Sequence, residues 1–279
     1  MNMTICISAI GTDKNSDGCD EEFIVFATDH MITFGNGEVD NKFEHNIKKY
    51  KPLGITKKCV AMLSGKTLLF EELLKGTEEL DDFDEIRKKI HNNFKDIKKK
   101  EIYNQLLSPF ALSEKDLKEF LLKPIENPVS KTILEGIMRH NLNTSILLIG
   151  FKNKKAQIYE INEMENISIR DIHFHTIGSG CFQASNSLFI QKHCREDNLK
   201  KTIYNVYKSK RNAEIAKGVG QDTEVLICSE KEIAQIIPED MEKLKDVYEK
   251  ELHFGQNEII KEDLNSLNSL NKCEVEKDV

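Results

Sequence analysis

The stretch Met3-Thr4-Ile5-Cys6-Ile7-Ser8-Ala9-Ile10-Gly11 decides how the rest of the chain is interpreted. It is a run of apolar and β-branched residues that ends at a glycine, which is typical of a β-strand. Thr4 stands at the first position of this predicted strand, directly after a methionine. Two interpretations are open: either Thr4 begins an ordinary strand, or the mature chain itself begins at Thr4.

The second interpretation gives Thr4 a particular chemistry. If residues 1–3 are removed, Thr4 carries a free α-amine and a hydroxyl on adjacent carbons. An α-amine has a pKa of roughly 7.7–8.0, so part of it is unprotonated near neutral pH and can accept the hydroxyl proton. One residue then supplies both a nucleophile and its base. We therefore expect residues 1–3 to be a leader that is removed.

Length, charge and cysteine content limit the class of protein. The chain has 279 residues, enough for one large domain or two small ones, and a formal net charge of −7, which argues against nucleic acid as a partner. Its seven cysteines form no C-x-x-C pair, so neither a disulfide framework nor a zinc ribbon is predicted. No apolar run reaches about 18 residues, and the N-terminus does not resemble a signal peptide. We expect a cytoplasmic protein with no membrane partner and no cofactor.

Strand-like and helix-like patterns alternate along the chain. The first 65 residues are predicted to form four or five antiparallel strands, and residues 67–140 to be helical, with helices that begin at the capping residues Ser113 and Ser130. Within this region the strongest amphipathic helix is predicted at 82–99. After this region, strands are predicted at 144–151, 156–161, 173–177 and 223–228, and helices at 182–195, 198–215 and 239–252. From about residue 262 a loose polar tail is expected. This order predicts an α+β protein with helices outside and two antiparallel sheets inside.

Two stretches have the residue types of a metal site without its spacing. The turn Asp13-Lys14-Asn15-Ser16-Asp17-Gly18 is similar to the first half of a calcium loop, but Ile24 stands at the twelfth position, where an EF-hand needs a glutamate. His173 and His175 would share one face of a strand, with no third ligand at a natural spacing. We predict a solvated hairpin tip and no metal, with calcium binding by the 13–20 loop as the minor alternative.

Several short segments gain meaning from their joint order. In chain order they are Thr4 at the head of a strand, Ala27-Thr28-Asp29, Ile47-Lys48-Lys49, Ala61-Met62-Leu63-Ser64-Gly65, Leu69-Phe70-Glu71-Glu72-Leu73, Thr144-Ser145-Ile146-Leu147-Leu148-Ile149 and Ile177-Gly178-Ser179-Gly180. Over residues 4–228 the chain thereby resembles the proteasome β-subunit family of N-terminal-nucleophile (Ntn) hydrolases, especially the simple bacterial HslV-type peptidase. The resemblance implies a four-layer αββα sandwich, here with an enlarged helical region at 67–140 and a C-terminal helix and tail at 229–279.

The resemblance also implies a role for each matched residue. Thr4 Oγ would attack an amide carbonyl and form an acyl-enzyme, Lys49 would favour the ionised hydroxyl, and Asp29 would hold Lys49 in place. The backbone N–H of Gly65 would bind the oxyanion, an interaction typically worth ~2.7–4 kcal/mol, and Ser179 would help to move the proton of the amine. The alternative for each is structural: two surface lysines, an aspartate that ends a strand, and a plain turn at 178–180.

The chain also departs from the family pattern. The segment that leads to Asp29 is longer, and Ile5 stands where a second threonine is frequent. The spacing that leads to Gly65 is slightly long. The late acid of the family has no clear match, because Asp222 and Glu214 are both out of register. The resemblance therefore predicts the early residues of the site more firmly than the late ones.

Two functions of different classes follow. The first is a threonine-type peptidase or amidase that acts on a peptide or protein substrate within a homo-oligomeric ring, with an ATPase as a further partner. The second is a catalytically inactive proteasome-like subunit that serves as a scaffold or binding module. The joint presence of Thr4, Asp29, Lys49 and Ser179 favours the first, and an unprocessed leader would favour the second.

Overall fold

The strand predicted at the start of the chain lies inside a sheet. In the computed structural model, which describes residues 4–14, 18–34, 41–44, 48–121 and 128–254, it becomes β1. The strands of this sheet are β1 (Ile5–Lys14), β2 (Asp20–Asp29), β10 (Phe174–Gly178), β11 (Thr223–Cys228) and β12 (Ile233–Gln235). Their order is β10-β1-β2-β11-β12, and all neighbours are antiparallel. β1 is therefore paired on both sides.

A second antiparallel sheet of five strands has the order β5-β6-β7-β8-β9. Its strands are β5 (Tyr50–Leu53), β6 (Cys59–Ser64), β7 (Ser145–Lys152), β8 (Lys155–Ile161) and β9 (Asn166–Ser168). β7 and β8 are joined by a two-residue hairpin turn in which Asn153 and Lys154 both have positive φ, as a type I′ turn requires.

Short strands are where the sequence prediction is wrong. β3 (Met31–Phe34) and β4 (Asn41–Glu44) make a separate two-stranded sheet that was not predicted. The described part of the first 65 residues thus holds six strands, β1 to β6, rather than four or five. β9 and β12, with three residues each, were also missed. Strands this short show too little alternation to be recognised.

Seven α-helices occur in the described residues. They are α1 (Phe70–Leu74), α2 (Phe83–Ile102), α3 (Glu114–Leu121), α4 (Pro128–Arg139), α5 (Cys181–Ile190), α6 (Leu199–Ala213) and α7 (Pro238–Phe254). The predicted capping of α3 is confirmed, since Ser113 N donates to Asp116 Oδ2 at 2.7 Å and Asp116 N donates to Ser113 Oγ at 3.3 Å. The predicted cap at Ser130 is wrong, because α4 begins at Pro128, a residue suited to the first helical turn.

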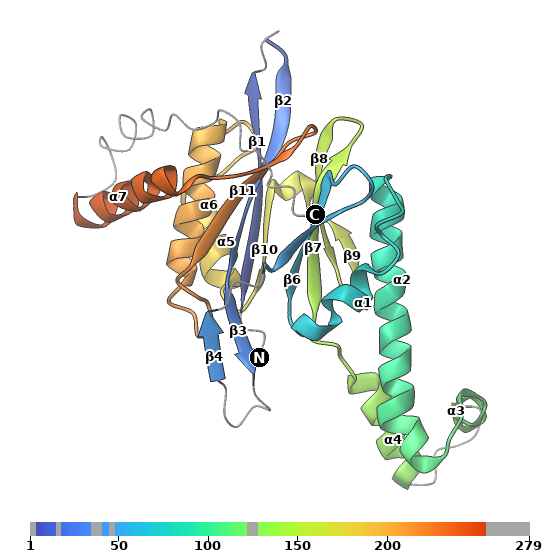
Figure 1. Cartoon of the computed structure of the whole chain (residues 1–279). Coiled ribbons are helices and arrows are strands. Elements are labelled where there is room, and N and C mark those ends of the chain that lie inside the picture. Colours follow the sequence, from blue (N-terminus) through green and yellow to red (C-terminus); the bar gives the residue numbers. More distant parts are fainter. Residues whose placement is uncertain (1–3, 15–17, 35–40, 45–47, 122–127, 255–279) are drawn as a thin grey trace.

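The helices and sheets lie in layers (Figure 1), and three hydrophobic cores fill the spaces between these layers. The first core joins α5, α6 and α7 to the β1 sheet, the second lies between the two sheets, and the third joins α1 and α2 to the β7 sheet. The predicted stripe of α2 is confirmed in the third core, where Phe83, Ile86, Ile90, Phe94 and Ile97 are all buried. Figure 1 shows that α2 runs past the end of its sheet, with α3 and α4 at its far end.

The strand register brings distant segments to one end of the β1 sheet. Ile5 pairs with Gly178, and Thr223 pairs with Asp29. Because neighbouring strands are antiparallel, the starts of β1 and β11 lie beside the ends of β2 and β10. Thr4, which immediately precedes β1, therefore stands at this end of the sheet.

Parts of the prediction lie outside the described residues. These are the leader at 1–3, the centre of the calcium-like turn at 15–17 and the tail from about residue 262. Within the described ranges, no helix combines the length and the apolar composition needed to cross a membrane.

Candidate active site

The hydroxyl of Thr4 is part of a closed triangle of polar groups. Thr4 Oγ1 donates to Asp29 Oδ1 at 2.7 Å and accepts from Lys49 Nζ at 2.6 Å. Lys49 Nζ also donates to Asp29 Oδ1, at 2.7 Å, so the two charged groups form an ion pair around the hydroxyl. Three side chains from separate segments of the chain thus meet at one oxygen.

The carboxylate of Asp29 is fixed at both of its oxygens. Asp29 is fully buried at the end of β2. Its Oδ1 accepts a third hydrogen bond from Ile5 N at 3.1 Å, and its Oδ2 accepts from Gly220 N at 2.8 Å. Hydrogen bonds to an ionised carboxylate are stronger than those between neutral groups, so this set determines the orientation of Asp29.

The two lysines before β5 have different environments. Lys49 is 6% exposed, and its carbonyl oxygen accepts from Leu63 N at 2.9 Å. Lys48 is exposed, with its Nζ 5.7 Å from the centre of the Tyr50 ring. The interpretation that both are solvated surface lysines is therefore wrong for Lys49.

Ser179 lies beside the backbone of Thr4. Thr4 N donates to Ser179 Oγ, and Ser179 Oγ donates to Thr4 O, both at 3.3 Å. The approach depends on Gly178, which has a φ of +107° and whose added Cβ would clash with the carbonyl of Thr4. The turn at 178–180 is thus shaped to touch the start of β1.

Gly65 is connected to this end of the molecule through its neighbours. It follows β6 with a φ of +122°, and an added Cβ would clash with the backbone of Asn143. Two residues earlier, Leu63 O accepts from Cys6 Sγ at 3.4 Å, which ties the end of β6 to β1. The hydrogen bonds of the Thr4 hydroxyl go to Asp29 and Lys49, and the role of Gly65 as oxyanion donor stays a prediction.

The loop before β11 contributes a group that sequence reasoning missed. Gly220 N binds Asp29, and nothing in the glycine-rich stretch 218–222 indicates which of its amides would do so. Of the two residues considered for the late acid, Glu214 accepts from Lys210 Nζ at 2.7 Å and from Arg211 Nη1 at 3.1 Å. Asp222 instead lines a neighbouring cavity.

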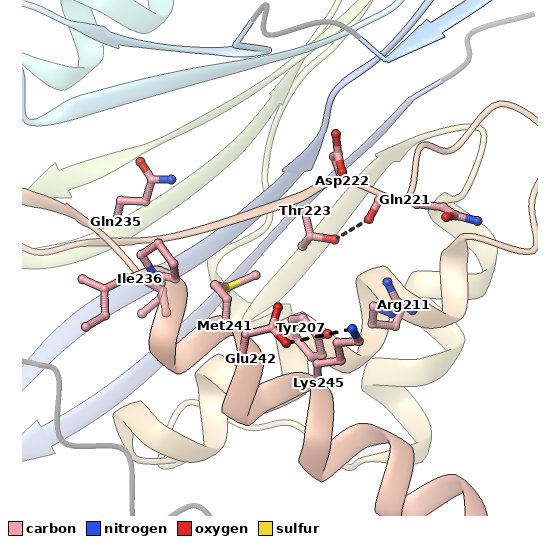
Figure 2. A pocket seen from close by; sticks show the side chains of 12 residues that line it. Tyr207, Arg211, Gln221, Asp222, Thr223, Gln235, Ile236, Met241, Glu242 and Lys245 are labelled. Carbon is pink, nitrogen blue, oxygen red and sulfur yellow. Dashed lines mark hydrogen bonds and ion pairs between the residues drawn. The ribbon is translucent and has the colours of Figure 1, made fainter.

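That cavity has a volume of about 720 Å³ and lies between α6, α7 and the β11–β12 hairpin (Figure 2). Figure 2 shows Arg211 and Tyr207 of α6 facing it together with Gln221 of the loop and Lys245 of α7. Because Gly220 is turned to Asp29 while Gln221 lines the cavity, the loop separates the cavity from the Thr4 site.

The predicted pair of histidines on one strand face is wrong. His173 precedes β10 and has a φ of +70°, so it belongs to a turn. His175 lies in β10, where its Nε2 is 2.6 Å from Glu160 Oε2. Within the described residues no group of three His, Cys, Asp or Glu side chains is arranged to hold a metal ion.

Comparison with known proteins assigns no family to the chain. No protein-family model matches the sequence, and no significant match is found among curated proteins. The likeness to proteasome β-subunits therefore rests on the quoted residues and on their order along the chain.

Proposed function

We propose that the protein is a threonine-type peptidase or amidase of the Ntn hydrolase class, with Thr4 as its nucleophile. The observation that carries the proposal is the position of Lys49 Nζ and Asp29 Oδ1 at 2.6 and 2.7 Å from the Thr4 hydroxyl oxygen. Burying an ion pair costs free energy, and a threonine that merely begins a strand does not need one. A nucleophilic hydroxyl does, because the adjacent cation favours its ionised form.

The first half of the proposed reaction forms an ester. Thr4 Oγ bonds to the carbonyl carbon of the substrate amide while its proton passes to the α-amine of the same residue. The ammonium of Lys49 stabilises the negative charge on Oγ during the attack. The carbonyl oxygen becomes an oxyanion, for which the backbone N–H of Gly65 is the proposed donor.

The second half restores the threonine. The carbon–nitrogen bond breaks, the leaving amine takes the proton from the α-ammonium, and the acyl group stays on Oγ as an ester. Water then attacks the ester carbon and gives a proton to the amine. The bond from that carbon to Oγ breaks, Oγ takes the proton back from the α-ammonium, and a carboxylic acid leaves. Ser179 Oγ, 3.3 Å from Thr4 N, is placed to accept and return a proton of this amine.

The proposal extends to fold and assembly. The order of helices, sheet, sheet and helices supports the αββα Ntn architecture. Members of this family enclose their sites in rings, so we propose a cytoplasmic homo-oligomeric ring that acts on peptide or protein substrates, with an ATPase as a further partner.

Turnover of peptide amides by Thr4 variants tests the proposal. Thr4→Ala should lower kcat/KM by a factor on the order of 10⁴ or more, because the nucleophile is gone. Thr4→Ser should retain measurable turnover, since serine keeps both the hydroxyl and the amine. Hydrolysis by Thr4→Ala at the rate of the unchanged protein would contradict the proposal.

A catalytically inactive proteasome-like subunit is the second candidate. It is favoured by the burial of Thr4, which is only 3% exposed in the unprocessed chain. A chain produced to begin at Thr4 separates the two candidates. Turnover by that chain favours the peptidase, and its absence with every peptide tested favours the inactive subunit.

A further inference from the structure

A second buried lysine stands behind the Thr4 site. Lys210 is fully buried, because its position on α6 belongs to the apolar stripe that includes Val206, Tyr207 and Ala213. The unusual feature is that this position holds a lysine. Lysine is almost never fully buried unless its charge is paired. A lysine in this stripe therefore needs an explanation beyond packing.

All three hydrogens of the Lys210 ammonium have acceptors. Lys210 Nζ donates to Glu214 Oε1 at 2.7 Å, and to the carbonyl oxygens of Gly220 and Gln221 at 2.8 Å each. Two of these three bonds hold consecutive peptide groups of the loop before β11. The ammonium thus fixes the plane and direction of the peptide that follows Gly220.

The loop held by Lys210 touches the Thr4 site at two points. Gly220 N donates to Asp29 Oδ2, the carboxylate oxygen that does not contact Thr4 or Lys49. Val219 is buried against Gly180, whose added Cβ would lie 2.8 Å from Val219 Cγ2. A displacement of this loop would therefore reach both Asp29 and the turn that contains Ser179.

We propose that Lys210 is a positioning residue of the site, which holds Asp29 in its productive orientation through the Gly220 amide. Lys210 touches neither Thr4 nor the atoms that react. It fixes the donor that binds one oxygen of Asp29, so that the other oxygen stays directed at the Thr4 hydroxyl and Lys49. The chemical consequence of this inference rests on the proposed function, and its structural part does not.

Charge makes lysine suitable at this position. Burial lowers the pKa of Lys210, and the carboxylates of Glu214 and Asp29 act in the opposite direction and favour its charged form. Lysine and carboxylate charges then alternate from Lys49 through Asp29 and Lys210 to Glu214. An uncharged side chain would leave the Glu214 carboxylate and the carbonyl groups of Gly220 and Gln221 without this donor.

The first test is Lys210→Met in the processed full-length chain. Methionine keeps much of the length and removes the charge and the donors. We expect kcat to fall on the order of 10²-fold with little change in KM, because a small misplacement of a catalytic group acts on the chemical step. Lys217→Met, an exposed lysine of the same connection, is the matched control and should leave kcat unchanged. Unchanged kcat in a folded Lys210→Met protein overturns the proposal.

A second variant addresses loss of folding. Lys210→Met with Glu214→Gln also removes the carboxylate charge that Lys210 balances, and circular dichroism shows whether each variant is folded. The double variant should show the same loss of kcat as the single one. A folded double variant with the kcat of the unchanged protein would equally overturn the proposal.

Hydrogen exchange of the Gly220 amide tests the structural part independently of any activity. In the unchanged protein this amide should exchange slowly, and in Lys210→Met at least tenfold faster, as local opening becomes easier. Rapid exchange of Gly220 in the unchanged protein overturns the inference whatever the variants do. Slow exchange in a protein without Thr4-dependent turnover would reject the proposed function and leave the positioning by Lys210 intact.

Discussion

Two buried polar clusters lie at different points along β1, and only one of them has the connections of an active site. The Thr4 cluster, at the start of the strand, consists of Thr4, Asp29, Lys49 and Ser179. The His193 cluster, farther along the strand, consists of His193, Cys194, Asp197 and Asn205. It joins β1 through His193 Nε2, which lies 3.0 Å from Ile10 O, and through Thr12 N, which donates to Asp197 O at 3.1 Å.

By residue type the His193 cluster is the more familiar catalytic set, with a cysteine, a histidine and an aspartate. The contacts of Cys194, however, make its thiol less reactive. Cys194 Sγ contacts Asp197 Oδ1 at 3.4 Å, and burial together with this carboxylate raises the pKa of the thiol. Burial lowers the pKa of His193, so the imidazole is neutral. A thiol that contacts an anion is not activated, whereas the Thr4 hydroxyl contacts the Lys49 cation as well as the Asp29 carboxylate.

The charge that contacts a nucleophile decides its reactivity more than the residue types gathered around it do. In the Thr4 cluster an ammonium touches the hydroxyl. In the His193 cluster the ring contacts the carbonyl of Ile10. The carboxylate there accepts from Cys194 N and from the Lys201 ammonium, so this ammonium touches the carboxylate and not the thiol. We therefore expect substitutions in the first cluster to change activity and substitutions in the second to change stability.

Among substitutions that leave Thr4 itself in place, the largest effect is expected for Lys49→Met. Loss of the ammonium beside Thr4 Oγ1 should lower kcat on the order of 10³-fold, within the range that proton-transfer and electrostatic groups contribute. Lys48→Met is the matched control, because the neighbouring lysine is exposed and should be replaceable without loss. Peptide turnover by the two variants gives the comparison. Equal activity of both would contradict the assignment of Lys49.

Next in size is the effect of Asp197→Ala on stability. Asp197 is 5% exposed and accepts from Lys201 Nζ at 2.6 Å and from Asn205 Nδ2 at 3.3 Å. Leaving the buried Asn205 amide without this acceptor should lower the free energy of unfolding by roughly 1–3 kcal/mol, and the half-exposed Lys201 ion pair adds little to it. Urea unfolding measures the change, with the exposed Glu196→Ala as control. The activity per folded molecule should stay the same, and a selective loss of kcat would break the distinction between the clusters.

A smaller effect concerns pH. Because burial lowers the pKa of His193, the unfolded chain binds a proton that the folded chain does not once the pH falls below about 6.5. This group therefore stabilises the fold fully above that pH, and its contribution is lost as the pH falls further. His193→Gln should lack this dependence, so its melting temperature should fall less than that of the unchanged protein on acidification. If the melting temperatures of the variant and the unchanged protein fall equally on acidification, His193 is not held neutral in the folded protein.

The smallest effect is expected for Cys194→Ser. The thiol is protonated and weakly bonded, so kcat should stay the same. The free energy of unfolding should change by no more than about 0.5–1 kcal/mol. Reaction with a thiol reagent at neutral pH should also be slow at Cys194. Loss of peptide turnover on modification of Cys194 would reverse the roles assigned to the two clusters.

The sequence predicts the fold best where a pattern repeats. The stripe of α2 and the strand β11 follow from periodicity and composition, and the strand has the predicted bounds. Ser130 was misjudged because Pro128 can begin a helix two residues earlier. β3, β4, β9 and β12 have three or four residues each, too few for an alternating pattern to be recognised, although each pairs with the strand next to it in the chain.

The candidate site could be predicted only where a residue is matched by a motif. Thr4, Asp29, Lys49 and Ser179 were all named from the sequence, and the structure brings these four into contact. Gly220 binds through its backbone, which no residue type reveals. Lys210 did leave a signal, since a lysine within the apolar stripe of α6 is a charge that must be paired.

The central claim is that Thr4 acts through its own amine, and the start of the mature chain tests it most directly. Intact mass combined with N-terminal sequencing of the purified protein identifies that start. The account predicts a chain that begins at Thr4, with residues 1–3 removed. A mature, assembled protein that keeps Met1 or Met3 would contradict it, because the nitrogen of Thr4 would then belong to a peptide bond and could not serve as the base.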